Sequence, residues 1–192
     1  CWYPPIAGAW RQDPALGGGG SLMDLGGHCI DLLEMFFGPV AAVRCETARL
    51  VQAYDSEDTA VVLFDFACGA KGAVDCLFNV PDAASRNRLE LYGSLGSILA
   101  EGTIGQGEAG RMEALLEAAP GDYAAAQVRA AAGGLEIAPP PVNTYRAEVE
   151  AFSRAVQENT PPPVPGEDGL WSQKVLAACY ESARTGGKVV VR

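Results

Sequence analysis

The amino-acid sequence predicts an α+β fold, in which a large, mostly antiparallel (mixed) β-sheet carries helices packed on one face. Three observations predict this class. Strand-like segments follow one another between residues 40 and 100 without intervening helices, which favours antiparallel or mixed pairing. Helix-like segments lie before and after that block, at 21–38, 144–158 and 167–184. Glycine and proline clusters separate these segments and give their boundaries.

The first regular element that we expect is a helix from Ser21 to Gly38 and Pro39. Serine is a suitable N-cap, and glycine followed by proline ends a helix. Apolar side chains recur at the helical period and define the face that would meet a core: Leu22, Leu25, Cys29, Leu33 and Phe36. The residues before this helix are predicted to be loop, with four consecutive glycines at 17–20.

Strands are expected next, because the segments 40–54, 59–68, 70–80 and 88–93 are rich in Val, Leu, Phe and Tyr. The short break around Gly69 predicts an antiparallel hairpin. A further strand is expected at 97–100. Residues 102–141 are rich in glycine and alanine and show weak periodicity, so we expect only short strands there, at 112–117 and 127–130.

Two helices and an edge strand complete the predicted fold. The helix at 144–158 is amphipathic, with an apolar stripe of Tyr145, Val149, Phe152 and Val156. The last helix covers 167–184 and is closed by Gly186. Residues 189–191 would form a short edge strand. Neither an internal repeat nor a flexible linker interrupts the sequence, so we expect one domain over residues 1–192.

Composition excludes several classes of function. The net charge of -10 argues against nucleic-acid binding, which needs a basic surface to neutralise phosphates. No apolar run approaches the ~18 residues that span a bilayer, so we expect no membrane partner. The six cysteines form no C-x-x-C pair or compact framework, which favours free thiols in a reducing cytoplasm.

The strongest candidate site contains the only histidine, His28. Asp24 and Asp31 lie four residues before it and three after it, which places all three side chains on one helix face. A neighbouring carboxylate would favour the protonated imidazole and fix its orientation. The pair therefore suits general acid–base chemistry on an alcohol or a carbonyl.

Other interpretations of this segment stay open. His28 could be a hydrogen-bonded structural residue on a solvated helix face. A divalent-metal site is the other functional alternative, but one histidine with two aspartates makes a poor transition-metal set. The glycines at 17–20 would let a ligand or another chain approach closely. Gly26 and Gly27 each cost roughly 1 kcal/mol inside a helix, which implies a packing or functional reason for them.

A second motif, GQGEAG at residues 105–110, fits the G-x-G-x-x-G pattern of dinucleotide-binding turns. That turn needs a continuous buried strand leading into it, and Gly102 and Thr103 interrupt the lead-in. Glu108 would also place a negative charge beside a pyrophosphate. We therefore predict a surface loop and no cofactor-binding residues. The sequence also lacks a G-x-S-x-G elbow and a Cys–His protease signature, so nucleophilic catalysis is not expected.

Residues 18–31, GGGSLMDLGGHCID, strongly resemble the G-G-G-x-L-x-D-x-G-x-H-x-x-D segment of the glucose–fructose oxidoreductase / inositol dehydrogenase / MocA (Gfo/Idh/MocA) oxidoreductase family. Weaker similarities cover nearly the whole chain: Trp10 and Arg11, Asp58 to Ala60, residues 91–97, residues 145–152, and Thr185 with Gly186. The motif belongs to the family's C-terminal domain. The resemblance therefore implies a glyceraldehyde-3-phosphate-dehydrogenase-like C-terminal domain.

The resemblance also implies NAD(P)-dependent oxidation or reduction of a sugar, a cyclitol or a related polyol. At the matching positions, His28 resembles the catalytic acid/base and Asp24 the carboxylate that binds substrate and orients the site. Asp31 matches a position with a structural role. Arg11 and Trp10 are expected to join Asp24 and His28 in binding the substrate.

The family's nucleotide-binding domain, with its Glu-Lys-Pro lysine, is not part of this sequence. We therefore expect residues 1–192 to be a substrate-binding and oligomerisation domain from a longer protein, and the start at Cys1 agrees with this. NAD or NADP would bind the full-length protein, and none is expected on this chain. A homodimer or tetramer through the sheet face is expected. The alternative is a non-catalytic oligomerisation or sugar-binding module that keeps the family fold.

Overall fold

The computed structural model describes residues 1–105, 107, 110–117, 123 and 134–192. These residues form two compact units, one made of Cys1–Ser85 with Val164–Arg192 and the other of Arg86–Pro163. Each unit contains a four-stranded sheet, and all the described strand pairs are antiparallel. The predicted α+β class is confirmed, with the strands divided between two sheets. None of the described helices is long and apolar enough to cross a membrane.

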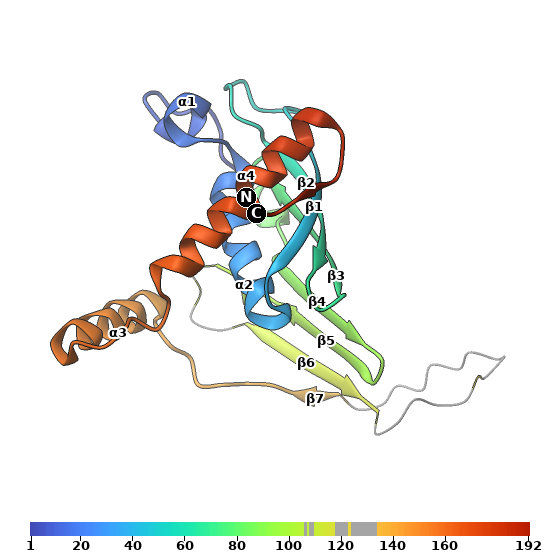
Figure 1. Ribbon diagram of the computed structural model, residues 1–192, viewed down its shortest axis with the longest axis vertical. Coiled ribbons are helices and arrows are strands. Elements are labelled where there is room, and N and C mark those ends of the chain that lie inside the picture. The colour runs from blue at the N-terminus through green and yellow to red at the C-terminus, as the bar shows by residue number, and fades with distance from the viewer. Residues whose placement is uncertain (106, 108–109, 118–122, 124–133) are drawn as a thin grey trace. The chain divides into compact units, whose positions relative to one another are not determined.

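The sheet of the first unit has the strand order β3-β2-β1-β8 (Figure 1). Its strands are β1 (Val40–Ala48), β2 (Thr59–Phe66), β3 (Lys71–Leu77) and β8 (Val189–Val190). The predicted hairpin between β2 and β3 is confirmed, and its turn contains Gly69 at φ +93°. Along β2 the side chains alternate between the core and solvent. This sheet therefore has an inner face and an outer face.

Helices cover the inner face of this sheet, as predicted (Figure 1). The helix α4 (Gly166–Thr185) packs on β1, and α2 (Gly27–Phe37) packs on α4. The core between these layers consists of fully buried apolar side chains, among them Leu22, Ile30, Val43, Val62, Phe78, Val175 and Leu176. Gly186 ends α4 at φ +71°, which confirms the predicted cap.

The helix expected from Ser21 onward is not α-helical throughout. Its first part, Leu22–Gly26, is a π-helical segment, and α2 follows it without a break up to Gly38. A Cβ atom on Gly26 would lie 2.7 Å from Cδ1 of Leu22. The glycine therefore leaves room for the Leu22 side chain to fold back over the wide turn. The sequence implied a packing or functional reason for Gly26 inside the helix, and this contact with Leu22 is a packing reason.

The second unit contains the sheet β4-β5-β6-β7 and one helix. Its strands are β4 (Arg88–Gly93), β5 (Gly96–Glu101), β6 (Arg111–Leu116) and β7 (Leu135–Glu136). The strands predicted at 88–93, 97–100 and 112–117 are confirmed within a residue or two, and the one predicted at 127–130 lies outside the described residues.

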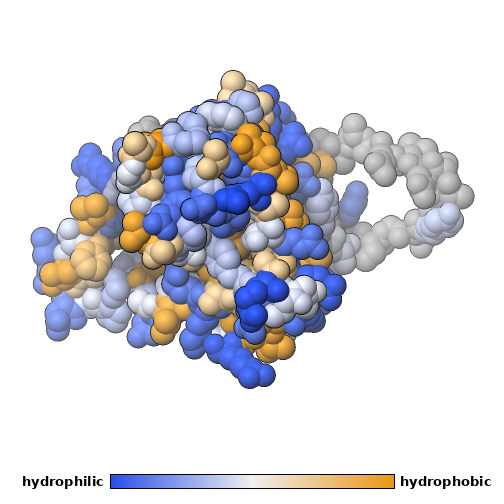
Figure 2. All heavy atoms as spheres, turned by 90° about the horizontal axis from the view of Figure 1, so that it is seen from above, coloured by the Kyte–Doolittle hydropathy of each residue, from blue (hydrophilic) through white to orange (hydrophobic). Residues whose placement is uncertain are grey.

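The helix α3 (Thr144–Glu158) has the predicted bounds and is capped by the side chain of Asn143. Its apolar stripe, however, faces solvent. Hydrophobic surface lies over this helix, at the left of Figure 2. The four stripe residues, Tyr145, Val149, Phe152 and Val156, are each 56–66% exposed.

Candidate functional site

The structure brings together three of the four residues predicted to bind substrate. Nε of Arg11 donates a hydrogen bond of 2.9 Å to Oδ1 of Asp24. The same guanidinium lies over the indole of Trp10, 4.3 Å from the ring centroid. Both members of the ion pair are partly exposed, so the pair contributes at most ~1 kcal/mol to stability. Its effect is to hold Asp24 in one orientation at an accessible surface.

His28 lies in the first turn of α2, about one helical turn beyond Asp24, and its side chain is exposed. Among the described residues the Asp24 carboxylate makes no hydrogen bond to the imidazole that it was expected to orient; its Oδ1 accepts from Arg11 instead. Within the described residues, no hydrogen bond reaches either ring nitrogen of His28. Both nitrogens are therefore accessible to a ligand. Asp31 is exposed on the same helix, and no cluster of three metal-ligating side chains occurs among the described residues.

The glycines before the π-helical segment are packed against the protein itself. A Cβ atom on Gly19 would lie 1.8 Å from Oη of Tyr180, and one on Gly20 would lie 2.0 Å from the carbonyl oxygen of Glu57. The expectation that these two glycines admit a ligand is therefore wrong. They allow the main chain to approach α4 and the loop before β2, and this approach places the start of the π-helical segment.

Replacing Gly20 by alanine is expected to destabilise the protein by roughly 1–3 kcal/mol, because the new methyl group would meet the backbone carbonyl of Glu57 at 2.0 Å and the main chain would have to shift. Gly27→Ala is the matched control. Its Cβ would lie 3.7 Å from Cδ1 of Leu176, an ordinary contact, and alanine favours the helix by about 1 kcal/mol. Urea unfolding followed by circular dichroism measures both variants. Equal losses of stability in the two would contradict this packing.

Asp58 organises the loop between β1 and β2, a role that the sequence did not predict. The side chain is fully buried. Its carboxylate accepts hydrogen bonds from the backbone amides of Leu50, Val51 and Gln52, at 2.8–3.1 Å. Burial alone would raise the pKa of Asp58, but these amides and the Thr59 hydroxyl outweigh it and lower the pKa to about 2.

These bonds also correct the first predicted strand. The sequence predicted a strand up to residue 54, but β1 ends at Ala48. The amides of Leu50, Val51 and Gln52 point to the Asp58 carboxylate, so they are not available to a neighbouring strand.

The loop held by Asp58 anchors both segments that carry the site. The Ser56 hydroxyl donates to the carbonyl oxygen of Arg11 at 3.0 Å. The carbonyl oxygen of Glu57 accepts from the amide of Ser21 at 3.0 Å. The Glu57 carboxylate accepts from the amide of Leu22 at 3.1 Å and from the Tyr180 hydroxyl at 2.9 Å. In the sequence, the weaker family similarity at Asp58 to Ala60 was the signal for this loop, and it did not predict these bonds.

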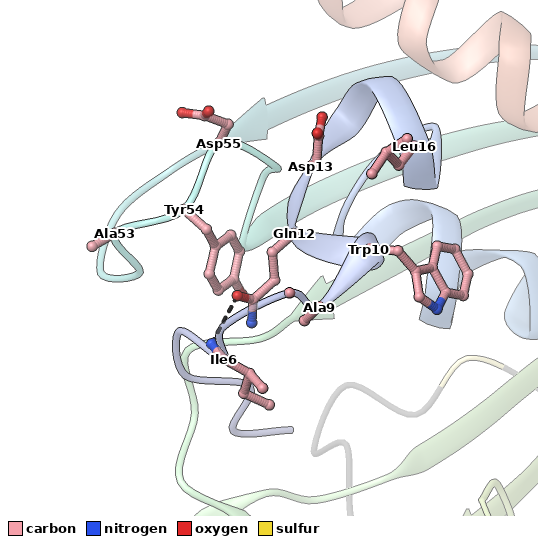
Figure 3. Close-up of a pocket in the computed structure, with 10 residues that line it drawn as sticks. Ile6, Ala9, Trp10, Gln12, Asp13, Leu16, Ala53, Tyr54 and Asp55 are labelled. Carbon is pink, nitrogen blue, oxygen red and sulfur yellow. Dashed lines mark hydrogen bonds between the residues drawn. The ribbon is translucent and has the colours of Figure 1, made fainter.

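A cavity of about 360 Å³ lies beside the turn that carries Trp10 (Figure 3). Its polar walls are bonded within the protein. The Gln12 side chain accepts from the amide of Ile6 at 2.9 Å and donates to the carbonyl of Pro4 at 2.7 Å. The Tyr54 hydroxyl donates to the carbonyl of Tyr3 at 2.9 Å. In Figure 3 the Trp10 indole points away from Tyr54 and Gln12. The residues that line the cavity therefore stabilise this turn, and neither Asp24 nor His28 is among them.

The glycine motif at 105–110 does not have the setting of a dinucleotide-binding turn. The glycine motif at 105–110, of which residues 106, 108 and 109 lie outside the described part, falls between β5 and β6. These two strands pair antiparallel, with Glu101 opposite Arg111. A dinucleotide-binding turn instead joins a strand to a helix in a parallel βαβ unit. The prediction that this motif is no cofactor fingerprint agrees with the pairing.

Comparison with known proteins places these features in context. The family model described as GFO/IDH/MocA C-terminal domain matches residues 1–99. A curated relative, D-xylose 1-dehydrogenase (NADP(+)) 2 of Haloferax volcanii, is 30% identical over 182 residues, which cover 93% of this chain and 50% of that protein. The chain spans about half the length of the curated relatives it matches.

Solved structures share the fold. The aldose-aldose oxidoreductase of Caulobacter crescentus, complexed with glycerol, has a TM-score of 0.77 at 25% identity, covering 98% of this chain and 52% of that one. Levoglucosan dehydrogenase in complex with NADH and L-sorbose has a TM-score of 0.78 at 21% identity, covering 100% and 54%. The resemblance and the fold expected from the glycine–Asp–His segment are confirmed by these matches.

Proposed function

Because this chain belongs to the GFO/IDH/MocA family, whose C-terminal domain it matches over residues 1–99, we propose that it is the substrate-binding half of an NAD(P)-dependent oxidoreductase. The substrate is a sugar, a cyclitol or a related polyol. One observation carries the proposal: the accessible imidazole of His28 lies one turn from a carboxylate, Asp24, that Arg11 holds in place. The names of the relatives, a xylose dehydrogenase and an aldose-aldose oxidoreductase among them, support this substrate class.

In the proposed reaction the chain binds and orients the polyol. The Asp24 carboxylate accepts hydrogen bonds from substrate hydroxyls, and Arg11 restricts its rotation. The Trp10 indole packs against the same guanidinium. The fixed geometry presents one hydroxyl to His28, which takes its proton as the carbonyl forms and returns it in the reverse direction. Such acid–base assistance contributes typically 10²–10⁴-fold.

The nicotinamide cofactor, which accepts or donates the hydride, is assigned to a separate nucleotide-binding domain of a longer protein. Two observations support this assignment. The glycine motif at 105–110 lies between two antiparallel strands, and the curated relatives are about twice the length that the chain covers.

A substrate screen tests the proposal. The longer protein is incubated with NAD or NADP and with D-xylose, levoglucosan or glycerol, and the absorbance of the reduced nicotinamide is followed. Turnover with at least one of these compounds is expected. Saturable sugar binding without any nicotinamide turnover would overturn the proposal in favour of a non-catalytic sugar-binding module.

We also propose that two copies associate through the outer face of the β3-β2-β1-β8 sheet. Val61 and Leu63 on β2 are 48% and 53% exposed on this face. Arg44, Glu46 and Asp75 lie beside them in the strand register, so the surface carries both charge signs. A surface of this kind can complement its own copy across a two-fold axis.

Replacing Leu63 by aspartate is therefore expected to dissociate the assembly. Analytical ultracentrifugation of the variant and of the unaltered protein measures this. Met35→Asp is the control, because Met35 is 70% exposed on α2, away from the outer face. An unaltered protein that sediments as a monomer, or a Leu63 variant that keeps the assembly, would contradict the proposed interface.

A further inference from the structure

Four of the six cysteines form two thiol pairs in the first unit, and the proposed function uses neither pair. Cys29 on α2 faces Cys76 on β3, and Cys45 on β1 faces Cys179 on α4. Each pair thus links the helical layer to the sheet. All four side chains are free thiols.

The first pair follows from the packing of the π-helical segment on β3. A Cβ atom on Gly26 would lie 3.5 Å from Sγ of Cys76. Cys29 is three residues further along the same helical face and therefore reaches the same sulfur. Contact between the thiols lowers the pKa of Cys29 and raises that of Cys76. Cys76 is 1% exposed, whereas Cys29 is only half-buried and follows His28 directly.

The second pair has the same arrangement in a sealed environment. The amide of Cys45 donates to the Ser182 hydroxyl at 2.9 Å, which fixes α4 over β1. Cys179 lies one turn before Ser182 on the same helix face, so its sulfur meets that of Cys45. The two residues are 2% and 0% exposed. In both pairs one thiol contacts the other, but only the Cys29–Cys76 pair has a member that solvent reaches.

We propose that Cys29 and Cys76 form a peroxide-sensitive dithiol beneath the candidate site. The Cys29 thiolate attacks one oxygen of hydrogen peroxide and breaks the O–O bond, which gives a sulfenic acid and, after protonation, one water. The Cys76 sulfur then attacks the Cys29 sulfur, forming the disulfide and releasing the hydroxyl as a second water. The two thiols lose two electrons and two protons, and the peroxide is reduced to two waters.

The disulfide would fix the first turn of α2 to β3. Cys29 and Cys76 are 47 positions apart in the sequence, so the bond closes a long loop and restricts the unfolded chain. Oxidation is therefore expected to raise the thermal unfolding midpoint. The disulfide also restrains the backbone at Cys29, the residue after His28. Oxidation of the dithiol would therefore alter the surface that carries the candidate site.

Peptide mapping tests this proposal. The folded protein, with the exposed Cys1 and Cys68 replaced by serine, is treated with hydrogen peroxide, alkylated in denaturant and digested. We expect a linked peptide pair containing Cys29 and Cys76, two hydrogens lighter than the reduced pair and restored by dithiothreitol. Cys45 and Cys179, the matched internal control, should remain fully alkylated. Failure to link Cys29 to Cys76, or linkage of both pairs at the same rate, would overturn the proposal.

A serine variant provides the second measurement. In Cys76→Ser, Cys29 has no partner thiol and should accumulate as sulfenic or sulfinic acid without a cross-link. If that variant does not fold, Cys29→Ser replaces it, and Cys76 should then stay reduced because it is buried. Rapid oxidation of Cys76 in the absence of Cys29 would contradict the assignment of Cys29 as the reactive thiol. Because the readout is a mass, it does not depend on the proposed enzymatic activity.

Discussion

Replacing Asp58 by alanine is expected to destabilise the first unit by about 3–5 kcal/mol. The substitution leaves the amides of Leu50, Val51 and Gln52 without their carboxylate acceptor in a partly buried loop. The loss should appear as a lower urea midpoint in circular dichroism. It should also reduce activity in the longer protein, since the same loop anchors Arg11 through Ser56.

Asp55→Ala is the matched control for this variant. Asp55 belongs to the same loop, but its side chain is 84% exposed and pairs with Arg49 at the surface. We expect a change within about 0.5 kcal/mol, as for other exposed ion pairs. A loss for Asp55→Ala as large as that for Asp58→Ala would show that the loop is not organised by the buried carboxylate.

Asp58 also predicts how stability depends on pH. Its pKa is about 2 in the folded protein and near 3.8 when unperturbed. The ionised carboxylate therefore stabilises the fold fully above about pH 4, and this stabilisation of about 2 kcal/mol is lost as the pH falls toward 2. Urea unfolding at a series of pH values measures the change. Asp58→Asn should be less stable at neutral pH and should lack this part of the acid-induced loss.

Replacing His28 by alanine is expected to lower kcat by about 10²–10⁴-fold in the longer protein, because the proposed proton acceptor is removed. The affinity for NAD or NADP should change less than about two-fold, since the cofactor is assigned to a separate domain. Steady-state kinetics with the sugar found in the substrate screen measure both quantities. A fall in cofactor affinity with unchanged kcat would contradict the role of His28.

Asp31→Ala provides the comparison for His28→Ala. Asp31 is exposed on the same helix, three residues beyond the histidine, and the family resemblance gives it a structural role. Its loss should leave kcat within about two-fold. A decrease equal to that of His28→Ala would indicate that the variants act through the helix rather than through the imidazole.

The sequence predicted those elements that depend on local periodicity. The bounds of α3, the hairpin at Gly69 and the cap at Gly186 were all predicted from apolar spacing and from single glycines. The end of β1 was not, because the Asp58 carboxylate that takes up the following amides lies six to eight residues further along the chain. The spacing of apolar residues carries no information about such a bond.

The sequence predicted which residues form the candidate site, but it did not predict the contacts between them. Helical spacing placed Asp24 and His28 on one face, but it did not predict which group Asp24 would bind. Arg11 reaches Asp24 from 13 residues earlier, on a turn that Ser56 holds by a tertiary hydrogen bond. In the same way, the period of α3 predicted its apolar stripe but not its exposure to solvent. Tertiary contacts decide both questions.

In the proposed reaction His28 faces the sugar, and the imidazole itself can report on this contact. His28 is the only histidine in residues 1–192, so its ring signals can be identified by their loss in His28→Ala. In the longer protein with NADP bound, saturating D-xylose, or the sugar found in the screen, is expected to shift the ¹H and ¹⁵N ring resonances of His28. Ring resonances that stay unchanged while the sugar is turned over would contradict the account.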